Sequence, residues 1–423
     1  MAVSSLVSAT LPMSSAVPLV VAAPRSRWWS ASAWTSFWAG FLTLFTISIV
    51  GELPVGELVL FAAAGWAVLC AVLNGAWPGS LFRRRWLAIL LAAQLVALVA
   101  YIASDLYRHS SPHDMARGWS RMIFLGVDVV AIAYLFGCWR GNLIVFVVGQ
   151  ALGQVASALT IGPMFGDLWK FGVGAPLTYL LFLVAPAGGA LATFLAAAGI
   201  GAAHFLLDYR SFGALCIAAG AFTLLQKTRP AFRLWLAPIA LAATIAAVFW
   251  VYDRTQARTR TTRSDIERSA MVQAAVEAIE SSPVVGHGSW FSNSDVYDNF
   301  MRIRLQLARE AHVGGFADPN RETDAMALHS QILVAVAEGG IFGGAFFFVF
   351  GAGLLTALLR TIILEPWHRR GPLHVLLLLS ALWNLLFSPF SGAHRVYIAM
   401  ACGLILLLQS PPSPGRQTRF ATQ

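Results

Sequence analysis

Arginine and histidine side chains next to apolar segments are the groups of this chain that are best suited to chemistry. Arg210 precedes an apolar run, Arg268 lies on a predicted helix, and His329 stands at the start of another apolar run. A guanidinium group is a planar fork that fits phosphate oxygens in pairs, and an imidazole exchanges a proton near neutral pH. These residue types together predict a site that binds an anion and moves a proton.

Arg268 belongs to a segment with a clear helix start. Ser264 and Glu267 form a Ser-x-x-Glu capping box, and Pro283 ends the segment. At 100° per residue, Arg268 falls near the middle of an apolar face, whose other members are Val272, Ala275, Val276 and Ile279. Two interpretations stay open: Arg268 meets a buried anion, or its stem lies along apolar surface while its charge reaches water.

His329 begins an apolar run that also contains Glu338. A lone histidine at a helix end is often structural, but its ordinary pKa also suits general base catalysis. Glu338 faces away from His329 at helical spacing, so we expect it to pair with a polar group on a neighbouring span. The small residues that follow have spacing typical of close helix packing, and they are Gly339, Gly340, Gly343 and Gly344.

Residues 283–288 read Pro-Val-Val-Gly-His-Gly and predict a tight turn. The turn lacks the nucleotide-binding pattern of a phosphate loop, and no strand-turn-helix unit surrounds it. His287 and His312 have no third metal ligand at useful spacing, so we expect no metal site here.

The composition identifies a membrane protein. Hydrophobic residues make up 58% of the chain and charged residues only 12%, whereas soluble domains are roughly a quarter charged. Repeated apolar runs of about 20 residues predict an all-α polytopic membrane protein. The net charge of +9 is mainly arginine in short loops, which sets membrane topology and does not indicate nucleic-acid binding. The cysteines lie in apolar runs and predict no disulfide framework; they are Cys70, Cys138, Cys216 and Cys402.

Twelve apolar runs predict about twelve transmembrane helices. They are 33–50, 56–76, 86–104, 119–138, 141–161, 174–187, 188–207, 211–226, 233–251, 328–359, 372–389 and 394–410. Arginine-rich loops favour the cytoplasm, and all of them can face it only if 174–207 forms two short spans that break at Pro186–Gly189.

This topology predicts five parts with both termini inside the cell. A cytoplasmic tail (1–30) precedes a bundle of about nine spans (31–251). A charged helical loop domain outside the cytoplasm (252–328) separates this bundle from three C-terminal transmembrane helices (329–410) and a second tail (411–423). The loop domain is too small to have a large core of its own, so it should fold against the bundle.

Three sequence features, in this order, resemble the O-antigen ligase and O-antigen polymerase superfamily of bacterial membrane glycosyltransferases. They are an Arg-Ser pair that opens a span, an Asp-x-x-Arg element that leads to a Pro-x-x-Gly-x-Gly turn, and a histidine followed by Glu-x-Gly-x-x-Gly. In this chain they are Arg210 and Ser211; Asp265, Arg268 and 283–288; and His329, Glu338, Gly340 and Gly343. Many members have Asn after the histidine, where this chain has Ser330.

The resemblance implies transfer of a glycan from undecaprenyl diphosphate to an acceptor hydroxyl at the periplasmic face of the inner membrane. Arg210 and Arg268 would bind the diphosphate leaving group, and His329 would act on the hydroxyl; no metal or other cofactor is implied. Ser211, His287, Ser330 and Glu338 complete the expected substrate-binding set. The implied partners are the lipid-linked donor, a glycan or lipid A-core acceptor, the bilayer, a chain-length regulator and a flippase, and no nucleic acid.

A different functional class remains an alternative at this point. A secondary transporter or lipid-linked oligosaccharide flippase could also have twelve spans. Such proteins tend to show inverted repeats and ionisable residues near the midplane, whereas this sequence shows no internal repeat and its charges gather in one external loop. A non-catalytic scaffold of an envelope assembly is a further alternative. Polymerase and ligase share their donor chemistry, so the sequence leaves open which of them this is, together with the sugar, its linkage, the acceptor and the oligomeric state.

Overall fold

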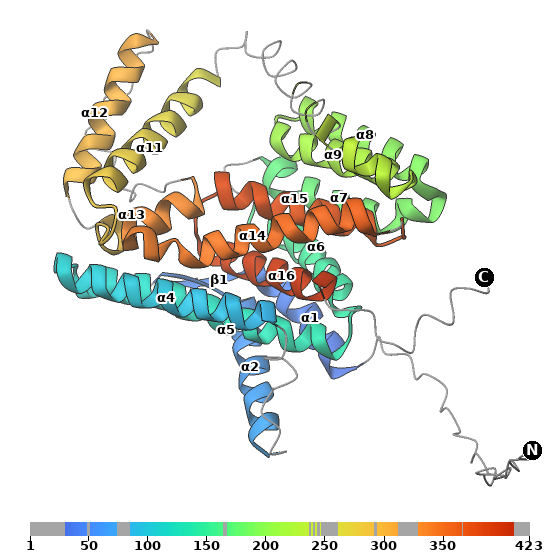
Figure 1. Cartoon of the computed structure of the whole chain (residues 1–423), viewed down its shortest axis with the longest axis horizontal. Coiled ribbons are helices and arrows are strands. Elements are labelled where there is room, and N and C mark those ends of the chain that lie inside the picture. Colours follow the sequence, from blue (N-terminus) through green and yellow to red (C-terminus); the bar gives the residue numbers. More distant parts are fainter. Residues whose placement is uncertain are drawn as a thin grey trace, which may run out of the picture.

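The described structure is an all-helical bundle with one small hairpin. The computed structural model describes residues 30–48, 51–73, 85–163, 167–236, 238–239, 242, 246, 261–291, 294–311, 329–365 and 367–409. In Figure 1, α4 (Arg85–Arg108), α14 (Ala345–Leu359) and α16 (Gly392–Gln409) run along the long axis, and α11 (Thr261–Ser281) and α12 (Ser294–Glu310) extend from one end. Within the described residues, strands β1 (Thr46–Ser48) and β2 (Glu52–Pro54) form an antiparallel pair.

The remaining helices complete the bundle. The N-terminal part contains α1 (Ala31–Phe41), α2 (Val55–Leu73), α5 (Pro112–Cys138), α6 (Asn142–Thr160), α7 (Gly174–Val184), α8 (Gly189–Leu206) and α9 (Arg210–Leu225). The C-terminal part adds α13 (Gln331–Gly343) and α15 (Gly371–Phe387). Short helical turns join them: η2 (Leu42–Leu44), η4 (Trp169–Val173), η5 (Ala185–Gly188), η6 (Ser289–Phe291) and η7 (Arg360–Leu364).

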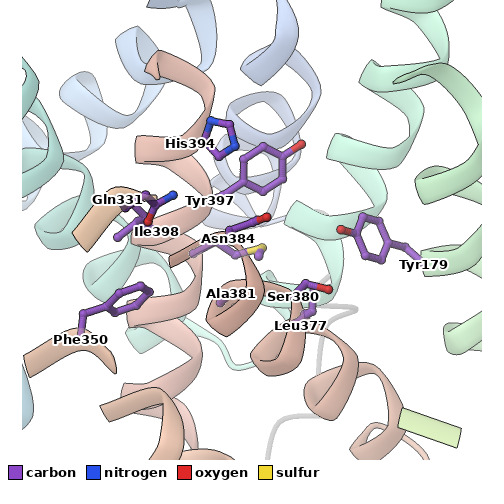
Figure 2. A pocket seen from close by; sticks show the side chains of 11 residues that line it. Tyr179, Gln331, Phe350, Leu377, Ser380, Ala381, Asn384, His394, Tyr397 and Ile398 are labelled. Atoms are coloured by element: carbon purple, nitrogen blue, oxygen red, sulfur yellow. The ribbon is translucent and has the colours of Figure 1, made fainter. Parts of the chain in front are cut away.

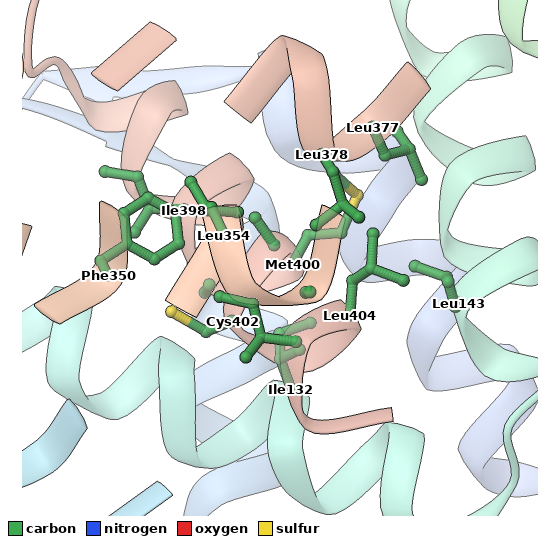
Figure 3. Close-up of a cluster of buried hydrophobic side chains, with 14 of the residues drawn as sticks. Ile132, Leu143, Phe350, Leu354, Leu377, Leu378, Ile398, Met400, Cys402 and Leu404 are labelled. Atoms are coloured by element: carbon green, nitrogen blue, oxygen red, sulfur yellow. The ribbon is translucent and has the colours of Figure 1, made fainter. Parts of the chain in front are cut away.

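The main core surrounds α16, which is buried along nearly its whole length. Figure 3 shows Leu354, Leu378, Met400 and Leu404 meeting from α14, α15 and α16, with Ile132 of α5 beside them. Between helices in a bilayer, close packing of such side chains supplies most of the attraction, because lipid tails are as apolar as leucine. The core therefore fixes the helices whose ends carry the site described below.

Membrane-type helices dominate the described residues. Seven helical segments among them are long and apolar enough to cross a bilayer, and three shorter apolar helices are α9, α13 and α15. This agrees with the predicted all-α membrane class. The total of twelve spans stays a prediction, because 233–251 lies mostly outside the described residues, as do the predicted tails 1–30 and 411–423 except for Ser30.

The first predicted run does not continue as one helix. Residues 33–50 were expected to form a span, but α1 ends at Phe41 and the chain passes through η2 into β1. Thr46 and Ile47 are β-branched and suit a strand better than a helix. β1 then pairs with β2, so the hairpin occupies the second half of the expected span.

The predicted break at Pro186–Gly189 is present. η5 separates α7 from α8 there, and Gly189 adopts a φ of +90°, which favours glycine. His204 near the end of α8 contacts Thr178 near the start of α7, with Nε2 and Oγ1 2.8 Å apart. The segment therefore turns back on itself, as the prediction of two short spans required.

The predicted run 328–359 is not one continuous helix. It contains α13 and α14, and α13 is kinked at Gly340, where φ is +66° and ψ is −171°. The turn at 283–288 causes the kink because it takes over the backbone hydrogen bonds of α13. The amides of His287 and Gly288 donate to Ala337 O (2.9 Å) and Glu338 O (3.0 Å), and the amide of Ile341 donates to Pro283 O (2.8 Å).

The predicted apolar face of α11 is wrong for its valines, whereas its member Ala275 is buried. Val272 is 46% exposed and Val276 is 40% exposed, and Arg268 lies on this open side. Helix α11 instead packs through an alanine side, because small residues let α12 and α13 approach closely; its buried members are Ile266, Ala270, Ala274, Ala275 and Ala278. α11 and α12 are the described part of the predicted loop domain 252–328.

Candidate active site

Arg268 and His329 lie near one another at the start of α13. His329 immediately precedes Ser330, the N-cap of this helix, and Arg268 belongs to the first half of α11, which packs on α13. Burial and then the nearby charge of Arg268 lower the pKa of the His329 imidazole, whereas Glu267 opposes this shift. The pair combines a cation on an open helix face with an imidazole that stays neutral at physiological pH. Such an imidazole can accept a proton.

A small cavity with apolar and polar walls lies close to His329. His394 of α16 is close enough to His329 for their charges to interact. Figure 2 shows His394 and Tyr397 around the cavity with Gln331, the first residue of α13, while Ser380 and Tyr179 line it from α15 and α7. The cavity volume of about 20 Å³ is close to the space that one water molecule needs.

The cavity walls contain buried polar groups without a protein partner. Both side-chain polar atoms of Gln331 and the hydroxyl of Ser380 have no hydrogen-bond partner among the described residues. Buried polar groups in proteins are nearly always hydrogen-bonded, to water where protein groups are absent. The chemistry of these walls therefore suits a water molecule or a ligand hydroxyl.

Arg210, the third predicted residue, is placed apart from this cavity. It is the first residue of α9, its side chain is 28% exposed, and its Nη2 lies 3.3 Å from Asp208 Oδ1. Arg210 does not line the cavity next to His329. Ser211 follows it in the first turn of α9 and is half-buried. The structure thus places Arg268 and His329 together, while a shared role for Arg210 stays a prediction.

Glu338 is the centre of a buried hydrogen-bond cluster that includes the expected partner on a neighbouring helix. Arg121 of α5 donates to Glu338 Oε2, and the Tyr101 hydroxyl of α4 donates to the same oxygen at 2.9 Å. The Trp290 amide donates to Oε1 at 2.9 Å. Because three donors bind this carboxylate, Glu338 joins α4, α5, α13 and η6 into one unit.

The 283–288 turn is held against α4 by further contacts. Asp105 accepts from the Ser289 amide (2.6 Å) and hydroxyl (2.7 Å) and from the indole N–H of Trp119 (2.7 Å). Arg108 donates to the Gly286 carbonyl at 2.9 Å and to the Ser282 hydroxyl at 2.7 Å. The turn is therefore rigid, and it fixes where α13 begins relative to α11.

Two of the predicted substrate-binding residues have structural partners. His287 is buried, and its Nε2 lies 2.8 Å from Ala278 O at the end of α11. The Ser330 hydroxyl accepts from the Leu333 amide at 3.3 Å and caps α13. Both residues shape the backbone around His329; direct contact with substrate stays a prediction for each.

A second buried charge cluster lies under the start of α16. Arg395 donates to both oxygens of Glu57, at 2.6 and 2.7 Å, and Asp128 of α5 interacts with the same carboxylate. Ionisable residues in apolar helices are rare and usually paired. This cluster fixes the residue that follows His394.

The sequence reading missed Asp105, Arg121 and Trp290. Asp105 and Arg121 lie far from the motifs in the sequence, and Trp290 lies two residues after the 283–288 turn. Folding places Arg121 and Trp290 against Glu338, and Asp105 against Ser289. Arg121 had a usable signal, because an arginine inside an apolar run is a functional candidate. Within the described ranges, no three histidine, cysteine or acidic side chains gather in a way that could hold a metal ion.

The fold and the site together define the class of this protein. It is a polytopic helical membrane protein with a cation and an imidazole at one end of its bundle. Residues 180–348 match the family model described as O-antigen ligase, and this match supports the membership of the O-antigen ligase and polymerase superfamily that the sequence predicted. The matched region contains Arg210, Arg268 and His329. The family indicates polysaccharide-related glycosyl transfer by a membrane enzyme. No match was found among curated proteins.

Proposed function

We propose that this protein transfers a glycan from undecaprenyl diphosphate to an acceptor hydroxyl at the periplasmic face of the inner membrane, without a metal ion. The observation that carries the proposal is the proximity of Arg268 and His329 inside a region that matches the O-antigen ligase model. Neither residue alone would indicate glycosyl transfer. Together they supply the cation that a diphosphate leaving group needs and the base that an acceptor hydroxyl needs.

The reaction breaks the bond between the sugar anomeric carbon and the diphosphate oxygen. A bond forms between that carbon and the acceptor oxygen, and the hydroxyl proton passes to His329 Nδ1 or Nε2. Negative charge grows on the leaving diphosphate, so a fixed guanidinium fork stabilises the transition state more than the bound donor. Arg268 supplies this fork, and Arg210 is assigned to the same anion.

The neutral state of His329 fits its assigned role. A general base must be unprotonated when the hydroxyl arrives, and a guanidinium nearby disfavours a second positive charge. Arg268 therefore has two effects, since it attracts the donor and keeps the base free of its proton.

An apolar groove offers a place for the polyprenyl tail. It has a volume of about 510 Å³ and lies between α4, the 283–288 turn and the end of α13; its lining includes Leu95, Val99, Val284 and Phe342. These side chains suit an isoprenoid chain and offer few groups to a sugar. α13 spans the distance from this groove to His329, so one lipid-linked donor could occupy both.

A deletion strain tests the proposed function. We expect loss of the surface glycan, restored by the wild-type gene and not by Arg268→Lys, because a lysine charge cannot replace the two-pronged contact. Arg302→Lys, in an exposed pair with Glu277 on the surface of α12, is the matched control and should restore the glycan.

The glycan pattern on a gel distinguishes the reactions. Single repeats without a chain-length ladder indicate a polymerase, and complete loss of surface-attached glycan indicates a ligase. Full restoration by Arg268→Lys at normal protein level would contradict the proposed site. An unchanged glycan in the deletion strain would contradict the proposed function.

A further inference from the structure

Arg117 is an arginine outside the proposed donor site, and among the residues that the structure describes its charge has no acidic partner. It lies in the first half of α5, is half-buried, and its guanidinium carbon is 3.9 Å from the centroid of the Trp290 ring. Its guanidinium group makes no hydrogen bond or ion pair within the described part of the chain. Asp105 and Glu338, the buried acids of this region, already bind other donors. A half-buried, unneutralised guanidinium group is well suited to an external anion.

Trp290 is held in an unusual conformation under this arginine. Its φ is +61°, in the left-handed region that a bulky residue rarely adopts. Such strain persists where surrounding contacts determine the backbone. Here the Trp290 amide donates to Glu338, and the residue follows the clamped Ser289. The indole is therefore a fixed platform.

The contact between Arg117 and the Trp290 ring uses one part of the guanidinium group. A guanidinium group lying over an aromatic ring uses its face for the ring and keeps its N–H edge for a planar anion. The fork is also preorganised, so binding an anion costs little side-chain entropy. Phosphate and carboxylate groups accept two parallel hydrogen bonds from such an edge.

The β1–β2 hairpin connects Arg117 with the His329 region. A Cβ added to Gly51 would lie 3.7 Å from Arg117 Nε. The carbonyl oxygen of the next residue, Glu52, would lie 2.6 Å from a Cβ on Gly392, which opens α16 two residues before His394. His394 in turn interacts with His329. Arg117 and the imidazole pair therefore flank one short hairpin.

We propose that Arg117, stacked on Trp290, binds a phosphate or carboxylate group on the acceptor glycan. This inference rests on the proposed function, which assigns the donor diphosphate to Arg268 and Arg210 and assigns no cation to the acceptor. The anion is not changed in the reaction. Its contact positions the acceptor so that its hydroxyl meets His329, which makes Arg117 a specificity residue for anionic acceptors.

The test measures sugar-phosphate binding in protein that lacks both arginines assigned to the donor. Protein with Arg210→Gln and Arg268→Gln, in nanodiscs, is titrated with glucose 1-phosphate and with glucuronate, and uncharged glucose serves as the reference. Adding Arg117→Gln should weaken binding of both anions about ten- to a hundredfold, the loss expected for hydrogen bonds to a charged group. Trp290→Leu should weaken binding several-fold, because the stacking is lost while the side chain stays large.

Controls separate folding from binding. Arg117→Lys keeps the charge and should retain part of the affinity, and Arg302→Gln on α12 should leave it unchanged. Equal anion binding with and without Arg117→Gln, in proteins with the same melting temperature, would overturn the proposal.

A transfer assay with otherwise wild-type protein separates the two proposals. Arg117→Gln should raise the KM for an anionic acceptor about tenfold or more and leave the KM for the donor unchanged. If anion binding depends on Arg117 but the wild-type protein shows no transfer, the anion site stands and the proposed function is contradicted. Transfer by the Arg117→Gln protein with an unchanged acceptor KM would leave the proposed function standing and contradict the anion site.

Discussion

At the scale of single residues, the central feature is the effect of Arg268 on His329. Arg268 does not lie in a buried apolar face, as its position along the sequence predicted, but on the open side of α11. An accessible guanidinium group can receive a large lipid-linked anion, which a buried one could not. The exposed side chain contradicts the interpretation in which Arg268 meets a buried anion and agrees with the one in which its charge reaches water. Binding of an accessible anion is our proposal.

The first prediction concerns the pKa of His329. Arg268→Gln removes a positive charge that lowers this pKa, so the pKa should rise toward its ordinary value and the acidic limb of the transfer rate should move to higher pH. Arg268→Lys keeps the charge and should keep the limb in place. Isotope-edited NMR of histidine, assigned with His329→Gln, measures the shift directly.

Glu267 provides a control of opposite sign. Its carboxylate raises the pKa of His329, so Glu267→Gln should lower that pKa further. If the pKa of His329 shifted in the same direction in the Arg268→Gln and Glu267→Gln proteins, charge would not be the cause of the shifts.

At the scale of elements, the 283–288 turn and α13 form one interlocked unit. Gly286 has a φ of +82°, and a Cβ there would collide with the Glu338 carbonyl; a Cβ on Gly340 would collide with the Val284 carbonyl. The two glycine motifs are thus far apart in the sequence, and their backbones fit closely against each other in the structure. This contact kinks α13 at Gly340.

The second prediction is that Gly340→Ala destabilises the protein. The φ and ψ of Gly340 are accessible almost only to glycine, and the added carbon also meets backbone. We expect a loss of at least about 2 kcal/mol of unfolding free energy, measured as a lower melting temperature in detergent. Gly199→Ala is the matched control, because a Cβ at Gly199 on α8 meets nothing within 4 Å. Equal melting temperatures for these two variants would contradict the interlocked unit.

Local signals in the sequence were enough to find much of this architecture. Hydrophobic runs located most helices, Pro186 and Gly189 marked the reversal, and the charge of Glu338 predicted a buried partner. The kink at Gly340 could not be predicted, because its cause is a turn more than fifty residues earlier in the chain. The buried face of α11 was missed because alanine carries little hydrophobic signal yet permits the closest packing.

At the scale of the whole molecule, the site elements share one end of the bundle. The turn contacts Arg108 at the end of α4, and Arg117 lies near the start of α5. His329 and His394 lie near the starts of α13 and α16. At the opposite end, Gln226 after α9 donates to Thr361 in η7. The proposed orientation places the first end in the periplasm.

The third prediction tests this orientation by cysteine labelling. In a protein without its native cysteines, His113→Cys and Arg302→Cys should react with a membrane-impermeant thiol reagent added to whole cells. Their parent side chains are 66% and 61% exposed. His368→Cys, between α14 and α15, is expected on the cytoplasmic side and should react only after the cells are opened. The reverse labelling pattern would place the site in the cytoplasm.

The most direct test of the account is to measure donor binding and glycan transfer in one purified variant, His329→Ala. We predict that this protein binds undecaprenyl-diphosphate glycan as the wild type does and loses transfer by about a hundredfold or more, the usual contribution of a general base. Loss of donor binding together with transfer would show that His329 positions the donor. Wild-type transfer by this variant would contradict the proposed site.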